Sequence, residues 1–258
     1  MIDFDSYIAA AETALVKLLE EWRPRLMESH GLSKFDLKAD KSVVTELDGL
    51  LETDIKNALR PLSDEVGFVG EEHGQEGNNS TFWFVDPIDG TEQYIRGLPG
   101  CRTLLCFMNN GEPIYAFAYR FTTADLFTAA KGDGTKKNGK KIFVPFRPFD
   151  RCWIDMAAGL DTKEAAEICY QINSAAKGCM NTKEFLYAVE GFMDGYVVFP
   201  GSERHYWDFA PRALLLQEAG MKIANFGSDK YNYKITSLIA THPDNFDELQ
   251  NLLSPEAS

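Results

Sequence analysis

Apolar residues recur at intervals of three and four near the start of the chain, which is the spacing of one face of an α-helix. The pattern predicts an amphipathic helix over residues 3–28 and a second one over residues 45–59. We expect Pro24 to bend or end the first helix, because proline lacks a backbone donor. The apolar positions are Tyr7, Ile8, Ala11, Leu15, Leu18, Leu19, Trp22 and Leu26 in the first stretch, and Leu47, Leu51, Ile55 and Leu59 in the second.

The pattern then changes to short apolar runs between turn residues, which favours β-strands. "VGFV" at 66–69 predicts a short strand before a polar loop, and residues 82–86 and 103–108 predict two more strands. "NNG" at 109–111 is a strong signal for a hairpin turn. The runs "PIYAFAYR" and "LFTAAK" extend this meander to about residue 145.

Beyond residue 145 the helical and strand patterns alternate. We place a lobe boundary at Pro145 to Pro148, which divides the chain into an N-terminal lobe, 1–145, and a C-terminal lobe, 146–258. Helices are predicted where apolar residues recur in polar stretches, and strands where apolar runs are short. The predicted helices are 162–176, 182–192, 207–220 and 243–253, and the predicted strands are 195–199 and 237–242.

Composition restricts the partners. The chain has 258 residues, enough for a sizeable core, and a formal net charge of −13. A chain this acidic repels nucleic acid and anionic membranes unless basic residues are concentrated somewhere. The one dense basic run, "KGDGTKKNGKK" at 131–141, is rich in Gly and Asn and predicts a solvated hairpin turn.

Cysteine usage and the start of the chain indicate a cytoplasmic protein. No apolar run reaches the ~18 residues that span a bilayer, and the first residues lack the basic and apolar segments of a secretion signal. The cysteines form no CxxC pair, so we expect buried free thiols in a reducing compartment and no zinc site. They are Cys101, Cys106, Cys152, Cys169 and Cys179.

The stretch "FWFVDPIDGT" at 82–91 carries the first indication of chemistry, because an apolar run ends in two carboxylates. The apolar residues predict a buried strand, so Asp86 lies at its carboxyl end, where α/β proteins place ligands. Gly90 allows close backbone approach, and Thr91 can open a helix whose first amides attract anions. Two carboxylates beside an anion-binding helix end suit a divalent cation that also binds phosphate oxygens.

Each acidic segment taken alone has a more ordinary interpretation. The pattern around Asp86 and Asp89 is usually an Asx turn with a helix cap. Glu71 in "GEEHG" at 70–74 is usually a surface residue. Asp208 in "HYWDFA" at 205–210 is usually an N-cap, and Asp48 at the start of the second predicted helix signifies little.

Together, however, "GEE" at 70–72, "DPIDGT" at 86–91 and "WD" at 207–208 resemble the inositol monophosphatase family of Mg²⁺-dependent, lithium-sensitive phosphatases. The resemblance extends from about residue 5 to the last predicted helix. It implies an α/β (α+β) fold, a layered α/β/α/β/α sandwich of the inositol monophosphatase and fructose-1,6-bisphosphatase type. It also implies a large antiparallel sheet in the first lobe, a smaller mixed sheet in the second, and a homodimer.

The resemblance also implies roles for named residues. Glu71, Asp86, the backbone carbonyl of Ile88, Asp89 and Asp208 would hold two or three Mg²⁺ ions, with Asp86 bridging two of them and Mn²⁺ as a possible substitute. The amides of Gly90 and Thr91 would bind the phosphate. The Thr91 hydroxyl and Asp48, with Glu71 nearby, would orient and deprotonate a metal-activated water. His73 and His205 are expected to be loop or supporting residues.

The substrate is less well defined. Arg96 after the motif, and Glu203 five residues before Asp208, are similar to the histidinol-phosphate branch of the family. Either residue fits a surface ion pair or a solvated loop equally well. The segment "KGCMNTKEFLYAVEG" departs from the small residues that the family often has before its penultimate helix. That departure affects the substrate assignment and leaves the metal ligands unaffected.

We therefore predict a phosphoric monoester hydrolase that acts on a small phosphorylated polyol or amino alcohol, such as inositol monophosphate or histidinol phosphate. A 3′(2′),5′-bisphosphate nucleotidase is the alternative within the family. A non-catalytic binding descendant of the fold is the alternative outside enzymes, and the complete set of acidic residues argues against it.

Overall fold

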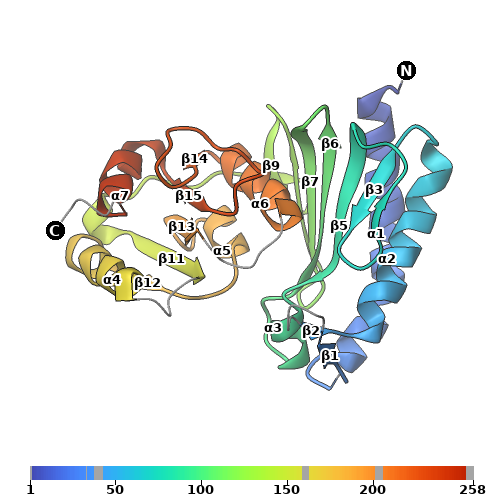
Figure 1. Ribbon diagram of the computed structural model, residues 1–258, viewed down its shortest axis with the longest axis horizontal. Helices are drawn as coiled ribbons and strands as arrows, with labels where there is room; N and C mark the ends of the chain where they lie inside the picture. The colour runs from blue at the N-terminus through green and yellow to red at the C-terminus, as the bar shows by residue number, and fades with distance from the viewer. Residues whose placement is uncertain (1, 33, 38–42, 159–162, 201–205, 254–258) are drawn as a thin grey trace. The chain divides into compact units, whose positions relative to one another are not determined.

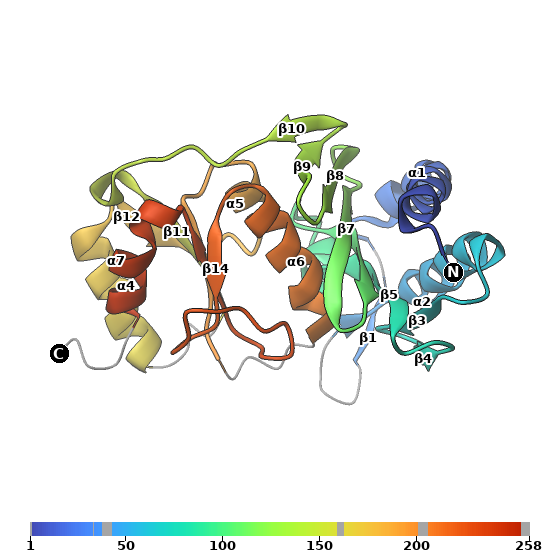
Figure 2. The ribbon, with the colours of Figure 1, turned by 90° about the horizontal axis from the view of Figure 1, so that it is seen from above.

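The computed structural model describes residues 2–32, 34–37, 43–158, 163–200 and 206–253, and it divides into two compact units, Met1–Thr128 and Ala129–Ser258 (Figures 1 and 2). The helices are α1 (Phe4–Ser29), α2 (Glu46–Leu59), α3 (Thr91–Ile95), α4 (Lys163–Ala175), α5 (Leu186–Val189), α6 (Tyr206–Glu218) and α7 (Phe246–Leu252). The strands are β1 (Asp36–Leu37), β2 (Val43–Val44), β3 (Gly67–Gly70), β4 (Gly74–Glu76), β5 (Thr81–Asp89), β6 (Arg102–Asn109), β7 (Glu112–Arg120), β8 (Asp125–Ala130), β9 (Gly134–Lys137), β10 (Lys140–Ile142), β11 (Trp153–Ala158), β12 (Gly178–Met180), β13 (Gly195–Val198), β14 (Lys222–Ala224) and β15 (Leu238–Thr241).

The predicted amphipathic helices α1 and α2 pack against each other and against one face of a sheet (Figure 1). The apolar spacing sets their orientation, because the buried residues of α1 recur at three- and four-residue steps. Pro24 lies inside α1, and the helix continues to Ser29, so it does not end at the proline. The buried residues of α1 are Tyr7, Ala11, Leu15, Leu19, Trp22 and Leu26.

This sheet has eight strands in the order β10-β9-β8-β7-β6-β5-β3-β4. Most neighbours are antiparallel, but β3 and β5 run parallel. Every residue of β5 after Thr81 is buried, as expected for a strand in the interior of the sheet. The strand extends to Asp89, three residues beyond the prediction.

The hairpin predictions are confirmed. Asn110 and Gly111 join β6 to β7 with φ of 49° and 82°, and Asn138 and Gly139 join β9 to β10 with φ of 50° and 76°. Positive φ at both turn residues matches the right-handed twist of the flanking strands. The basic run at 131–141 therefore forms a hairpin, as its Gly and Asn residues predicted.

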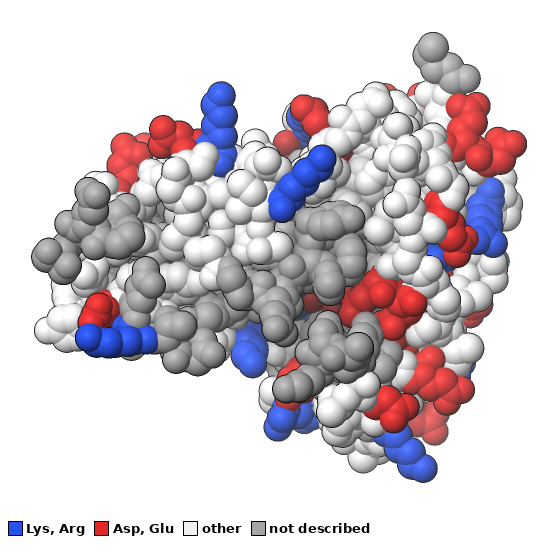
Figure 3. Space-filling model, viewed as in Figure 1, with Lys and Arg blue, Asp and Glu red and all other residues white. Residues whose placement is uncertain are grey.

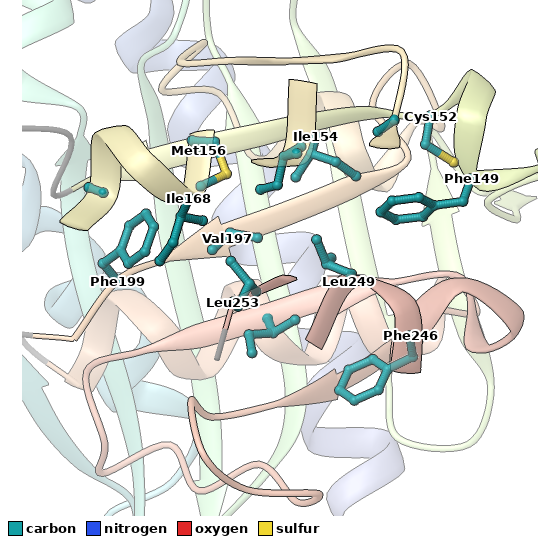
Figure 4. Packing of buried hydrophobic residues seen from close by; sticks show 14 of the residues in the cluster. Phe149, Cys152, Ile154, Met156, Ile168, Val197, Phe199, Phe246, Leu249 and Leu253 are labelled. Atoms are coloured by element: carbon teal, nitrogen blue, oxygen red, sulfur yellow. The ribbon is translucent and has the colours of Figure 1, made fainter. Parts of the chain in front are cut away.

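The second unit contains a mixed five-stranded sheet in the order β12-β11-β13-β15-β14. β11 is parallel to β12 and β13, and β15 is antiparallel to its neighbours. α4 and α7 contribute to an apolar cluster that covers the sheet (Figure 4). Its larger members are Phe149, Ile154, Met156, Ile168, Ile172, Phe199, Ile239, Phe246, Leu249 and Leu253.

The helix predicted over 182–192 is wrong for most of its length, since only α5 is helical there. The amide of Glu184 donates to the hydroxyl of Thr182, and the amide of Leu186 donates to the carboxylate of Glu184. These local side-chain acceptors compete with helical hydrogen bonds. Lys183, with φ of 53°, also lies outside the helical region. The short strands β11, β12 and β14 were not predicted.

All five cysteines are free thiols. Cys101, Cys106 and Cys152 are buried as expected, whereas Cys169 and Cys179 are only partly buried. Among the residues that the structure describes, no helix is long and apolar enough to cross a membrane. Figure 3 shows several groups of acidic side chains on the visible face, in keeping with the net charge of −13.

Candidate active site

The parallel pair β3 and β5 brings two predicted metal ligands to one edge of the sheet. Gly70 pairs with Val85, and the amide of Glu71 donates to the carbonyl of Val85 at 3.0 Å. Glu71 and Asp86 are therefore the next residues on two adjacent parallel strands. Asp86 is only 4% exposed, so this predicted ligand is a buried acidic residue.

The "DPIDGT" segment bends where the strand ends. The pairing of β5 with β6 shifts register between Asp86 and Asp89, which is the signature of a bulge. The hydroxyl of Thr91 donates to the carbonyl of Ile88 at 2.9 Å. That carbonyl has a second lone pair, so it can also serve as a metal ligand.

Gly90 begins α3 in a conformation that favours glycine. Its φ of 86° is left-handed, and a Cβ atom there would lie 2.4 Å from the carbonyl oxygen of Gly100. Both facts exclude an ordinary side chain. The backbone amides of Gly90 and Thr91 therefore stand at a turn whose conformation depends on glycine.

Asp48 lies close to the "GEE" loop. As the third residue of α2 it accepts hydrogen bonds from the amide and the hydroxyl of Thr45, at 2.8 and 2.6 Å. Burial raises the pKa of Asp48 to about 7, the bonds from Thr45 act to lower it, and the charges of Glu72 and Glu71 raise it further. Asp48 thus caps a helix and is also coupled to Glu71.

Glu52 was missed in the sequence, although it holds this loop. Its side chain is fully buried and accepts hydrogen bonds from the amide of Glu72 at 2.8 Å and the amide of His73 at 3.1 Å. The same carboxylate lies 2.9 Å from Nδ1 of His73 and 2.9 Å from Nζ of Lys56. Gly70 leaves room for it, since a Cβ there would lie 1.9 Å from Glu52 Oε1.

A sequence signal for Glu52 existed. Asp48, Glu52 and Lys56 recur every four residues and form a charged stripe on α2. Charged residues at this spacing usually face solvent, so the stripe did not stand out. Here all three side chains are buried, which is unusual unless the groups are paired.

Arg102 was also missed. Its Nε donates to Oδ2 of Asp89 at 2.7 Å, and the two side chains are 2% and 7% exposed. Arg102 is the first residue of β6 and lies directly opposite Asp89 in the sheet register. Only the strand pairing shows this, because the apolar pattern predicted a strand that begins one residue later.

The substrate-side residues are less well defined. Arg96 forms an exposed ion pair with Glu92, whose side chain is one turn earlier, at 2.6 Å. Glu203 and His205 lie outside the described residues. Asp208 is the third residue of α6 in the second unit, and its side chain is likewise outside the described set.

The donor atoms at the end of β5 fit a magnesium ion. Among the described side chains, which do not include that of Asp208, no group of three or more His, Cys, Asp or Glu residues could hold a metal by itself. The carboxylates of Glu71 and Asp86 and the carbonyl of Ile88 are hard oxygen donors. Mg²⁺ usually takes only one or two carboxylates from the protein and completes its shell with water and substrate phosphate.

Comparisons with known proteins find relatives over most of the chain. "Nus factor SuhB" of Xylella fastidiosa is 28% identical over 200 residues, covering 74% of this chain and 72% of the relative. "Inositol monophosphatase 2" of Saccharomyces cerevisiae is 28% identical over 238 residues, covering 81% and 80%. The chain is similar to both over most of their length.

Solved structures show the same fold. The IMPase of Thermotoga maritima superimposes with a TM-score of 0.83 at 23% identity, covering 92% of this chain and 94% of that one. An IMPase/NADP phosphatase crystallised with Mg²⁺ and phosphate gives a TM-score of 0.78 at 17% identity, covering 99% and 96%. The predicted fold class is confirmed.

The family assignment rests on nearly the whole chain. Residues 3–255 match the model of the inositol monophosphatase family, a range that includes every acidic motif described above. This chain therefore belongs to the inositol monophosphatase family.

Proposed function

We propose that this chain is a Mg²⁺-dependent phosphate monoester hydrolase that acts on a small phosphorylated polyol or amino alcohol. The observation that carries the proposal is the adjacent placement of Glu71 and Asp86 directly after the last parallel pair of β3 and β5, followed along the chain by the glycine turn at Gly90. Family membership supports a phosphatase. The neighbouring positions of Glu71 and Asp86 provide the oxygen donors that a divalent metal ion would need.

Glu71, Asp86, the carbonyl of Ile88 and Asp208 would hold the metal, whereas Asp89, the remaining predicted ligand, is already paired with Arg102. When bound, Mg²⁺ would supply positive charge to the phosphate and make water more acidic. Two or three ions with Asp86 as a bridge, and Mn²⁺ as a substitute, belong to the same proposal.

The remaining residues would position the phosphate and move a proton. The amides of Gly90 and Thr91 would orient the phosphate oxygens. Asp48 would accept a proton from the attacking water, because a carboxyl group with a pKa of about 7 is suited to proton transfer near neutral pH. The Thr91 hydroxyl donates to Ile88, so its oxygen is left as an acceptor that can orient this water.

A small metabolite is a better partner than a polymer. A net charge of −13 opposes binding to nucleic acid. Some relatives are named Nus factor SuhB. That name applies to those relatives, and no partner of this chain is inferred from it. Arg96 and Glu203 are proposed to contact the polyol or amine, and the homodimer remains a prediction.

The test is phosphate release with and without Mg²⁺ from inositol 1-phosphate, histidinol phosphate, fructose 1,6-bisphosphate, 3′-phosphoadenosine 5′-phosphate and NADP. One substrate well ahead in kcat/KM, and only with Mg²⁺, would support the proposal and identify the branch. Preference for the phosphoadenosine compound would favour the nucleotidase alternative. Asp86→Asn is the matched control, and hydrolysis that survives it would point to a contaminating phosphatase.

A further inference from the structure

A buried arginine already neutralises one carboxylate of the proposed metal site. Arg102 is 2% exposed and donates from Nε to Oδ2 of Asp89 at 2.7 Å. Its Nη2 also lies 3.4 Å from the carbonyl oxygen of Gly100. A guanidinium group stays charged at every pH at which the protein is folded, so this positive charge is permanent.

The surrounding strands hold Arg102 in place. Arg102 is the first residue of β6, and its backbone is paired with that of Asp89 in the sheet register. The hydroxyl of the next residue, Thr103, donates to the carbonyl of Pro87 at 2.9 Å, which ties β6 to the same turn. A fully buried side chain in such a position cannot turn out into solvent without opening the sheet edge.

This pairing changes the charge balance at Asp89. One oxygen of the carboxylate is already bound to a cation, and a divalent ion at Asp89 would be repelled by the guanidinium at short range. Asp86 precedes the bulge and pairs with Leu104 in the sheet register, and Glu71 directly follows β3.

We propose that Arg102 is a built-in cation at Asp89 that takes the place of a divalent ion, so that the site binds one ion fewer than its carboxylates would otherwise hold. The inference rests on the proposed function, because it requires a divalent-cation site at Asp86. It makes Arg102 a positioning residue that sets the number of metal ions.

The experiment counts Mn²⁺ ions bound per chain, from the electron paramagnetic resonance signal of free Mn²⁺, in the full-length protein. Arg102→Met is expected to bind one more Mn²⁺ per chain than the wild type, because Asp89 becomes available. Arg102→Lys keeps the charge and is expected to retain the wild-type count. Arg147→Met removes the arginine of another Arg–Asp pair, with Asp194, and is expected to change nothing.

Equal counts for the wild type and Arg102→Met would overturn the inference, and so would an extra ion in Arg147→Met. If Arg102→Met does not fold without metal, circular dichroism is repeated in Mn²⁺. Folding restored by Mn²⁺ supports the inference, since an ion that binds only the folded state stabilises it, and a chain that stays unfolded overturns it. A wild type that binds no Mn²⁺ and releases no phosphate would show instead that the proposed function is wrong.

Discussion

Replacing Glu52 by alanine is expected to lower the free energy of unfolding by about 3–5 kcal/mol, the usual cost of removing one partner from a buried ion pair. The Glu52 side chain is 0% exposed and that of Lys56 is 4% exposed, and their charged atoms lie 2.9 Å apart. Without Glu52, the partner that remains to Lys56 among the described residues is Glu76, at 3.3 Å and 41% exposed. A half-exposed carboxylate compensates a buried ammonium poorly.

The lost loop contacts add little to that figure but affect activity. The amides of Glu72 and His73 each lose a charged acceptor, worth about 1.5–3 kcal/mol when no replacement is available. Both residues are partly exposed, so water can replace the carboxylate. The expected total loss in the free energy of unfolding is therefore still about 3–5 kcal/mol. Because Glu71 precedes these two residues, the loosened loop should also lower kcat.

Urea unfolding of the metal-free protein measures this cost as a lower midpoint at an unchanged m-value. The matched control is Glu76→Ala, which removes the exposed partner of the same Lys56 and should cost at most about 1 kcal/mol. Lys56→Met in the Glu52→Ala background should recover part of the loss, because no unpaired buried charge remains. A Glu52→Ala loss no larger than that of Glu76→Ala would refute the reasoning, as would a double variant less stable than the single one.

Three further predictions concern the same unit. In EDTA, the contribution of Asp48 to stability should fall by about 4 kcal/mol as the pH rises from 4 to 7, because its carboxyl group has a pKa of about 7 in the folded chain against 3.8 ordinarily, so the folded chain holds this proton more tightly than the unfolded one. Asp48→Asn should remove this slope in urea midpoints, and parallel profiles for the two proteins would contradict the assignment. Gly90→Ala should cost about 1–3 kcal/mol through its left-handed φ and the contact with Gly100, and an unchanged melting temperature would argue against that strain. Millimolar Li⁺ should inhibit phosphate release, and indifference to Li⁺ at saturating substrate would count against the family-based expectation.

Local patterns determined the parts of the fold that depend on neighbours in sequence. The spacing of apolar residues predicted α1 and α2, because a helix buries one face at 3.6 residues per turn. Turn residues predicted the β6–β7 hairpin, since Asn and Gly tolerate positive φ. The "DPIDGT" motif identified the region where the apolar run of β5 meets two carboxylates, although the strand itself continues to Asp89. The segment at 182–192 failed because side-chain acceptors overrode its helical spacing.

Only the tertiary structure decided which charges meet. Glu52 reaches a loop twenty residues later, and Arg102 meets Asp89 through the register of β5 and β6. Both side chains appeared in the sequence as ordinary charged residues beside apolar ones. Burial gives them their roles, because a charge removed from water must find a partner, and strand pairing determines which partner is within reach.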